Sequence, residues 1–329
     1  MHPSITHIID ALDPNRRTVV LSHGAGQDSA AMLALLHDDD LPEIRQRYLG
    51  NAQLLVVHSD TGAERPETVE YRNYIARYCH DHGAIYFQID RNLGFHTGGW
   101  VGGLHGQWDA THSIGSVAFG SVCSDRLKIG PIWAAINVIL AFSYHVSPIR
   151  RGGLRAHVER FSALIDCLIG FGADEQRRAN RVNEPTTCQL DLFRTKKPRT
   201  KANPQWFQET VRRQYPLIDL GFNREAAQRY LRSRGMPIPM PSMCQTCHWA
   251  DEAAVAYLDR TDPQLMAYWI EAEKRKQLRH PGTGKNHGVK GAIPLPHFLA
   301  RARNMYAALS TEELRERIRR DGHSVKSRM

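Results

Sequence analysis

A short glycine-containing loop is the first place in this chain where the residue types suggest chemistry. The apolar run from Thr18 to Leu21 predicts a buried strand, and the sequence from Ser29 onward predicts a helix. A strand, a loop and the start of a helix present backbone N–H groups and the positive end of the helix dipole to an anion. Gly24 and Gly26 allow the backbone to approach that anion closely. The pattern predicts a phosphate-binding loop.

Polar side chains within the same loop add to this prediction. Ser22 and Ser29 can donate hydroxyl hydrogen bonds to a phosphate. Asp28 would repel a phosphate unless the two share a Mg²⁺ ion, which binds carboxylate and phosphate oxygens together. No Gly-Lys-Ser or Gly-Lys-Thr follows, so this is not the P-loop motif. An ordinary tight turn between a strand and a helix is the alternative that these residues alone leave open.

Cysteines form the second set of residues with chemical potential. The chain contains six of them, Cys79, Cys123, Cys167, Cys188, Cys244 and Cys247. Only Cys244 and Cys247 form a Cys-x-x-Cys pair, a spacing typical of metal, cluster or redox chemistry. Cys167 lies in an apolar run and is predicted to be a small buried side chain. Cys188 lies in a polar segment, where packing gives no reason for a thiol.

Alternating strands and helices must position these residues. Apolar runs over residues 54–58, 85–89 and 165–171 predict three more strands, and helices are expected over 66–82 and 133–144. This alternation predicts an α/β fold with a doubly wound parallel sheet and helices on both faces.

A polar loop, Asp60-Thr61-Gly62, follows the strand predicted over 54–58. A loop in that place lies at the carboxyl edge of a parallel sheet, where such sheets bind ligands. Asp60 could alternatively cap the next helix.

The chain divides into three predicted parts. Residues 1–190 form a nucleotide-binding α/β domain that carries a glycine-rich lid at 91–120, because a long stretch that is hard to assign is usually a lid or binding loop. Residues 191–250 combine a basic linker with the Cys-x-x-Cys pair and complete that domain. Residues 251–329 form a helical C-terminal extension. His96, His105 and His112 lie in the lid, but their spacing fits no tight metal site.

Five separated segments resemble the phosphoadenosine-phosphosulfate (PAPS) reductase-like family of the adenine-nucleotide alpha-hydrolase superfamily, which includes the PP-loop ATP pyrophosphatases. Residues 24–29 resemble its Ser-Gly-Gly-x-Asp-Ser loop, with Gly24 and Ala25 replacing the first two residues. The others are the Asp-Thr-Gly loop at 60–62, a Cys-x-x-x-Leu-Lys segment starting at Cys123, an Asp-Glu-x-Arg-Arg segment at 174–178 and a Pro-Leu-x-Asp segment. They occur in the order of the family.

The resemblance implies roles for individual residues. Asp28 would hold Mg²⁺, and Lys128 and Arg177 would neutralise charge that develops on the nucleotide phosphates. Contacts with ATP would come from the remaining residues of the two loops, Ser22, Gly24, Gly26, Gln27, Ser29, Asp60, Thr61 and Gly62.

The resemblance also implies a 4Fe–4S cluster on three of the cysteines, Cys123, Cys244 and Cys247, with Cys188 as a candidate fourth ligand. A structural Zn²⁺ site on the same four thiols is the second alternative, and a dithiol is the third.

We therefore expect an ATP-using enzyme that releases pyrophosphate, adenylates an acceptor and supports sulfur transfer. One alternative is a sulfonucleotide reductase that uses an external thiol, because no cysteine follows Cys247 to serve as its own nucleophile. The other alternative is a non-catalytic module that binds nucleotides or nucleic acid.

Composition bears on partners and location. The net charge of +9 and the pI of about 9.4 suit an anionic partner such as a nucleotide, tRNA or DNA. A sulfur-donor protein is the other expected partner. The N-terminus shows no apolar signal segment, and the apolar stretch at 133–142 is too short to span a bilayer. We expect a cytoplasmic protein without a membrane partner.

Overall fold

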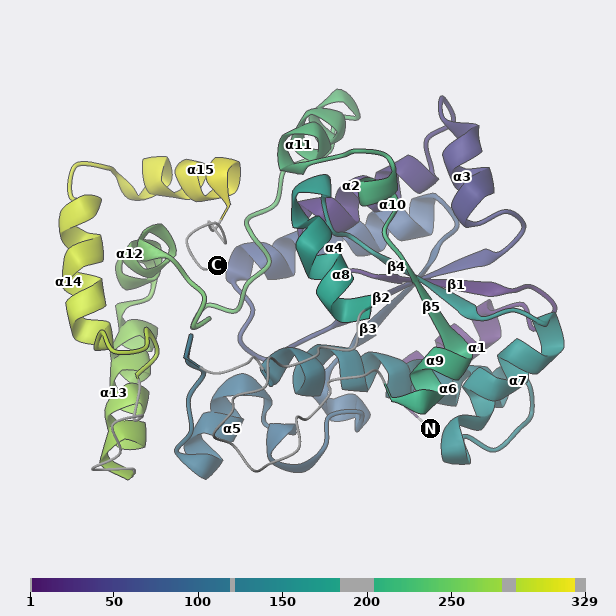
Figure 1. Ribbon diagram of the computed structural model, residues 1–329, viewed down its shortest axis with the longest axis horizontal. Coiled ribbons are helices and arrows are strands. Elements are labelled where there is room, and N and C mark those ends of the chain that lie inside the picture. Colours follow the sequence, from purple (N-terminus) through teal and green to yellow (C-terminus); the bar gives the residue numbers. More distant parts are fainter. Residues whose placement is uncertain (1, 119–121, 184–203, 280–287, 323–329) are drawn as a thin grey trace, which may run out of the picture. The chain divides into compact units, whose positions relative to one another are not determined.

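The computed structural model describes residues 2–118, 122–183, 204–279 and 288–322 (Figure 1). Cys188, most of the basic linker and residues 280–287 lie outside the described residues. The chain forms two compact units, each assembled from three segments. We call the first the sheet unit, comprising Met1–Val57, Ile75–Phe87 and Ile136–Pro237, and the second the cysteine unit, comprising His58–Tyr74, Gln88–Ala135 and Ile238–Met329.

Five strands form one sheet, in the order β3-β2-β1-β4-β5. Their bounds are β1 Thr18–Ser22, β2 Gln53–Ser59, β3 Ile85–Ile89, β4 Ile165–Ile169 and β5 Val211–Gln214. The pairs β1–β2, β1–β4 and β4–β5 run parallel. The predicted doubly wound α/β fold is confirmed, as are the four predicted strands.

The strand order reverses direction at β1. Ser22, the last residue of β1, pairs with Val57 of β2 on one side and with Ile169 of β4 on the other. Open parallel sheets bind ligands in the crevice outside the carboxyl ends of the strands at such a switch point. The loops that follow β1 and β4 therefore meet where the fold favours a ligand.

Helices pack against both faces of the sheet in the sheet unit. Figure 1 shows α2, α3 and α11 on one face and α1, α7 and α9 on the other. The strands between them are buried on both faces, and Val19, Val20 and Leu21 are fully inaccessible to solvent. The helices of this unit are α1 Pro3–Ala11, α2 Gln27–Leu36, α3 Pro42–Tyr48, α7 Gly152–Phe161, α8 Gln176–Asn183, α9 Gln205–Thr210, α10 Pro216–Asp219 and α11 Arg224–Ser233.

Strand β5 was not predicted, because its sequence is polar. Asp166 of β4 is almost completely buried and pairs with Arg212 across the strands. Arg212 donates to both of its carboxylate oxygens at 2.6 and 3.0 Å, and Arg17 lies 3.2 Å from one of them. Gln214 donates a further hydrogen bond of 2.6 Å. β5 thus joins the sheet through a buried charge network rather than through an apolar run.

A long apolar helix crosses from one unit to the other along the chain. A π-helical turn, Asp125–Ile129, leads directly into α6, Gly130–Ser143. Together they span 19 residues, which corrects the expectation that this stretch is too short to cross a bilayer. Sixty-one per cent of its most apolar window is buried within the protein, as in a core helix, so its length and composition are weak evidence for a membrane.

The cysteine unit is mainly helical. Helix α4, Pro66–Asp81, begins in it, and the helices after the Cys-x-x-Cys pair are α12 Glu252–Thr261, α13 Pro263–Arg279, α14 Leu295–Met305 and α15 Thr311–Asp321. The predicted C-terminal helices are present, and α12 packs against α13, α14 and α15. The predicted division of the chain into three parts stays a prediction.

The glycine-rich segment at 91–120 is not structureless, contrary to expectation. It contains helix α5, Gly103–Thr111, whose Leu104 and Trp108 are buried in the core of the cysteine unit. These apolar side chains anchor the segment to the core, although its many glycines gave no sign of a helix in the sequence. A lid function for the segment remains a prediction.

A buried histidine in the sheet unit gives a testable pH dependence. His157 is fully buried beside Tyr144, and burial lowers its pKa to about 4. Because the unfolded chain binds a proton near pH 6.5 and the folded chain does not, the free energy of unfolding should fall as the pH drops from 6.5 toward 4. At pH 5 the expected loss is about 2 kcal/mol. Urea unfolding of the wild type and of His157→Gln at pH 7.5 and pH 5 isolates this contribution, because Asp28, whose pKa is raised to about 6, changes the stability of both proteins in the opposite direction. His157→Gln should reduce the difference, and an unchanged difference would contradict the assignment.

Candidate functional site

The predicted phosphate loop connects β1 to α2 in the sheet unit. Gly26 is the N-cap of α2, in an extended conformation, and no side chain caps the helix. Ala30 donates its backbone N–H to the Gly26 carbonyl at 3.1 Å, and the Ser29 hydroxyl donates to the same carbonyl at 3.0 Å. The first N–H groups of a helix have no partner within the helix. The start of α2 is therefore arranged to bind an anion.

The left-handed residue of the loop is Ala25, not a glycine. Its φ angle is +55°, and its side chain is fully buried. Its N–H donates to Nδ1 of His23 at 3.1 Å, which holds this turn. Gly24 and Gly26, the two glycines predicted to let the backbone approach an anion, have no positive φ among the described backbone angles.

Substitutions at Ala25 test this strain. Ala25→Gly should change the free energy of unfolding by less than about 1 kcal/mol, because relief of the left-handed conformation offsets the lost methyl group and the more flexible unfolded chain. Ala25→Val should destabilise the protein by more than about 2 kcal/mol, because a β-branched residue fits this φ poorly and overpacks the site. Thermal unfolding compares the two. Equal effects of glycine and valine would contradict a strained turn.

A glycine at the end of β4 closes the other side of the loop. A Cβ atom on Gly170 would lie 2.7 Å from the backbone nitrogen of Ser29 and 3.0 Å from the carbonyl carbon of Asp28. Only glycine permits this approach of β4 to the start of α2. Gly170 lies inside the strand predicted over 165–171, and the sequence gave no sign of this contact, which depends on the β1–β4 pairing.

Asp28 lies in the first turn of α2 and is held by its neighbour. Gln27 donates to Oδ1 of Asp28 at 3.1 Å, and Gln228 of α11 donates to the Gln27 side-chain oxygen at 2.8 Å. Burial raises the pKa of Asp28 to about 6, while Gln27 and Arg224 act in the opposite direction. A half-buried carboxylate with a raised pKa gains stability from a cation, as a Mg²⁺ ligand would. Gln27 is thus a support for Asp28.

Charged residues from two other segments surround Asp28. Asp174 and Glu175, which follow β4, raise its pKa by repulsion, and Arg224 at the start of α11 lowers it. Arg224 was not among the predicted site residues, because no motif marks it. Arg177 is exposed on α8, two residues after Glu175. Its predicted role toward phosphate stays a prediction.

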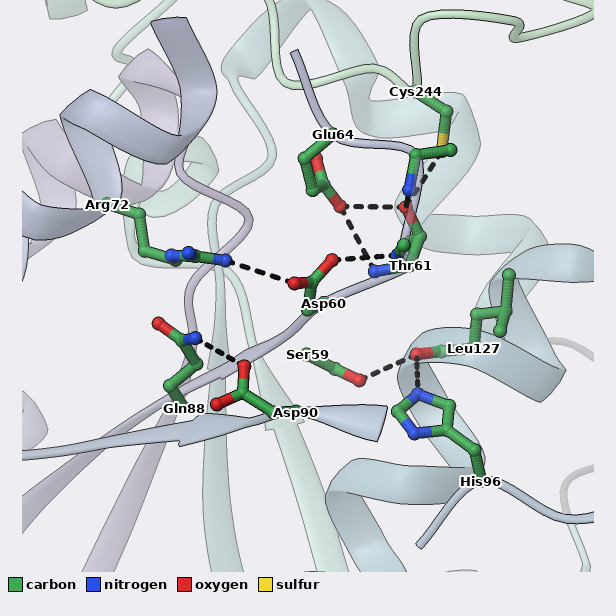
Figure 2. Close-up of polar contacts among 12 residues, drawn as sticks. Ser59, Asp60, Thr61, Glu64, Arg72, Gln88, Asp90, His96, Leu127 and Cys244 are labelled. Atoms are coloured by element: carbon green, nitrogen blue, oxygen red, sulfur yellow. Dashed lines mark hydrogen bonds and ion pairs between the residues drawn. The ribbon is translucent and has the colours of Figure 1, made fainter. Parts of the chain in front are cut away.

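The second predicted loop lies in the cysteine unit, where Figure 2 shows its contacts. Asp60 accepts a hydrogen bond from the backbone N–H of Gly62 at 2.7 Å and pairs with Arg72 at 3.4 Å. It therefore forms a local turn and does not cap α4, whose first residue is Pro66. Gly62 has a φ of +72°. Both glycine and aspartate are thus explained by the geometry of the turn, and a nucleotide contact from Asp60 stays a prediction.

Thr61 connects this loop to the Cys-x-x-Cys turn. Its hydroxyl donates to Glu64 at 3.0 Å and lies 3.3 Å from Sγ of Cys244 (Figure 2). The other carboxylate oxygen of Glu64 is buried without a hydrogen-bond partner, and so is one guanidinium nitrogen of Arg65. Buried polar atoms usually have a partner in folded proteins, so these two atoms leave a place for a water molecule or a ligand.

Lys128 lies in the π-helical turn that precedes α6, a geometry often found at functional sites. The carbonyl of Leu127 in that turn accepts hydrogen bonds from Ser59 at 2.6 Å and from His96 at 3.2 Å (Figure 2). Burial disfavours the charge of Lys128, yet its pKa is raised because Glu64, Cys244, Cys247 and Cys123 lie nearby. Lys128 thus lies among sulfur and carboxylate groups of the cysteine unit, and its predicted role toward phosphate stays a prediction.

Three of the four predicted metal ligands share one neighbourhood of the cysteine unit. Cys123, Cys244 and Cys247 all pack against its hydrophobic core as half-buried side chains. Burial is the main factor that raises the pKa of each thiol. The nearby Cys247 raises the pKa values of Cys123 and Cys244 further. Their chemistry suits iron or zinc.

Their arrangement does not yet match a metal site. In the part of the chain that the structure describes, no group of three His, Cys, Asp or Glu side chains is placed to hold a metal ion. The predicted fourth ligand, Cys188, lies outside the described residues. The Nε2 atom of His96 bonds to the Leu127 carbonyl, that of His105 bonds to the Thr246 hydroxyl at 2.8 Å, and neither ring belongs to such a group.

Comparisons with known proteins add only weak structural likeness. No family model and no curated protein matches the chain. Among solved structures, the U34-tRNA thiolase NcsA from Methanococcus maripaludis with its [4Fe-4S] cluster is similar to it at a TM-score of 0.33 and 13% sequence identity, over 93% of this chain and 80% of that chain. A likeness of this degree supports no conclusion about activity. The fold assignment depends on the strand order and pairing described above.

Proposed function

We propose that this chain is an ATP pyrophosphatase of the PP-loop type that activates an acceptor for sulfur transfer. The observation that supports this most directly is the uncapped start of α2 at the switch point of the sheet, with Asp28 in its first turn. The N–H groups of this turn would bind the pyrophosphate portion of ATP. Asp28 would share a Mg²⁺ ion with the phosphate oxygens, since this ion needs few protein ligands when phosphates supply the rest.

The proposed reaction has two balanced steps. An acceptor oxygen attacks the α-phosphorus of ATP, the bond between the α-phosphorus and the bridging oxygen breaks, and pyrophosphate leaves. A sulfur nucleophile at the level of hydrosulfide then attacks the carbon that bears the adenylated oxygen, and AMP leaves with that oxygen. Arg177 and Lys128 are proposed to neutralise phosphate charge. The acceptor is proposed to be a tRNA or DNA, in keeping with the net charge of +9.

The sulfur-handling part of the proposal depends on Cys123, Cys244 and Cys247. Their shared neighbourhood and the unpartnered polar atoms of Glu64 and Arg65 support a ligand at this place. We propose a 4Fe–4S cluster, with Zn²⁺ as the alternative, and Cys188 as the fourth candidate ligand. No step of the reaction above is assigned to the metal.

Pyrophosphate release is the primary test. The full-length protein is incubated with ATP and Mg²⁺, with bulk tRNA, duplex DNA or no acceptor, and pyrophosphate and AMP are measured. Pyrophosphate release that depends on Mg²⁺ and on one acceptor supports the proposal. Sulfite formation from PAPS with thioredoxin would instead indicate a sulfonucleotide reductase. ATP binding without either product would indicate a non-catalytic module.

Metal analysis tests the cysteine assignment separately. Anaerobic purification should give iron and sulfide together with absorption near 400 nm, and both should be lost in Cys123→Ala and Cys244→Ala. Cys79→Ala is the matched control, because Cys79 is a fully buried free thiol of the sheet unit. Stoichiometric zinc without iron would favour the structural alternative, and no bound metal would refute both.

A further inference from the structure

The Cys-x-x-Cys turn is fastened by contacts from residues far away in the sequence. Gln245 donates its N–H to the carbonyl of Ala63 at 2.8 Å, and Thr246, which is fully buried, bonds to His105. Within the turn, the N–H of Cys247 donates to the Cys244 carbonyl at 3.1 Å, and that of Ala250 donates to the Cys247 carbonyl at 2.8 Å. These contacts fix its first half.

A buried lysine from the C-terminal extension fixes the second half. The Lys290 ammonium donates to the carbonyl of His248 at 2.8 Å and also to that of Ala250. It is 8% exposed and lies 4.7 Å from the ring centroid of Phe298. A buried ammonium is costly unless several acceptors surround it. Here those acceptors are the carbonyls immediately after Cys247.

A buried glutamate in turn fixes the segment that carries Lys290. Glu273 of α13 is 2% exposed, and its two carboxylate oxygens accept the N–H groups of Val289 and Leu295, each at 2.7 Å. A Cβ atom on Gly288 would lie only 2.1 Å from the Glu273 carboxylate, so glycine is required for this approach. The segment also pairs with itself through Gly288–Gly291 and Lys290–Ile293 bridges.

We propose that Glu273 and Lys290 form a two-step clamp that positions the Cys-x-x-Cys turn. Glu273 holds the 288–295 segment, and that segment aims Lys290 at the backbone after Cys247. The C-terminal helices are then part of the sulfur site rather than an appended domain. As a statement about the sulfur site, the proposal rests on the proposed function. As a statement about the turn, it can be tested without ATP, acceptor or metal.

Hydrogen–deuterium exchange of the full-length protein tests the clamp. In Lys290→Met, we expect the protection of the Cys247 and Ala250 amides to fall at least 10-fold, while amides in α2 keep their protection. Arg260→Met is the matched control. Arg260 also donates to two carbonyls of the cysteine unit, those of Tyr306 and Leu309, both at 2.6 Å, but it makes neither contact to this turn. In Arg260→Met, the exchange protection of the Cys247 and Ala250 amides should stay within 2-fold of the wild-type value.

A second variant makes the test specific for a shared mechanism. Glu273→Gln replaces one acceptor oxygen by a donor and should expose the same two amides. Combining it with Lys290→Met should add no further exchange at the turn, although it should lower the urea midpoint further. If Lys290→Met does not fold, Glu273→Gln alone decides. Wild-type protection at 247 and 250 in a folded variant would overturn the clamp.

The same variants separate this inference from the proposed function. Iron or zinc bound per chain should fall in Lys290→Met and Glu273→Gln but not in Arg260→Met. If the wild type releases no pyrophosphate but its turn still loosens in Lys290→Met, the clamp stands and the proposed function fails. If the wild type releases pyrophosphate but the turn keeps its protection in Lys290→Met, the proposed function stands and the clamp fails.

Discussion

Asp28→Asn is expected to lower the rate of pyrophosphate release from ATP by roughly 10²- to 10³-fold. Asparagine still accepts the hydrogen bond from Gln27, so the loop keeps its geometry, but the site loses the negative charge proposed to hold Mg²⁺. Stability should change in the opposite direction. Because the pKa of Asp28 is raised to about 6, its ionised form is disfavoured in the folded state, and its removal should stabilise the protein by up to about 3 kcal/mol at pH 8.

Asp13→Asn is the matched control for this prediction. Asp13 precedes β1, at the opposite end of the strand from the phosphate loop, and accepts the N–H of Asn15 at 2.9 Å. Its substitution should leave pyrophosphate release unchanged. The rate of pyrophosphate release and the urea midpoint of unfolding are measured for both variants, so that a loss of activity can be distinguished from a loss of stability. A folded Asp28→Asn protein with wild-type activity would contradict the proposed role of Asp28 in binding Mg²⁺.

Gly170→Ala is expected to have the second largest effect. The added Cβ would lie 2.7 Å from the nitrogen and 2.9 Å from the Cα of Ser29, and these backbone atoms cannot rotate away. We expect a loss of about 1–3 kcal/mol of stability from the forced shift. Displacing the N–H groups of α2 by even 1 Å should also weaken ATP turnover by roughly 10²-fold. Equilibrium unfolding and pyrophosphate assays measure the two effects.

Gly106→Ala provides the comparison for Gly170→Ala. Gly106 lies within α5, and a Cβ there would meet no other atom within 4 Å. Alanine should therefore leave activity unchanged and stabilise the helix slightly, by about 0.5–1 kcal/mol. If Gly170→Ala and Gly106→Ala have the same stability and the same rate of pyrophosphate release, the close contact between β4 and α2 does not require glycine at position 170.

Strands β1 to β4 and the loop after β1 were predictable because their signals are local. β1 and β4 are short apolar runs, and the loop after β1 combines small residues with the start of a helix. β5 has no such run, because Arg212 and Gln214 pair with the buried Asp166 on the neighbouring strand. A strand stabilised by a charge on another strand cannot be recognised from its own residues.

The sequence by itself determined the first four strands and their alternation with helices, the place of the glycine-containing loop after β1 and the identity of the thiols. Only the tertiary structure decided that Ala25 makes the bend, that Gly170 closes the loop and that Lys290 and Glu273 fasten the Cys-x-x-Cys turn. The physical reason is the range of the interactions. Periodicity and turn chemistry act over a few neighbouring residues, whereas steric fit and buried charges join residues that are close only once the chain has folded.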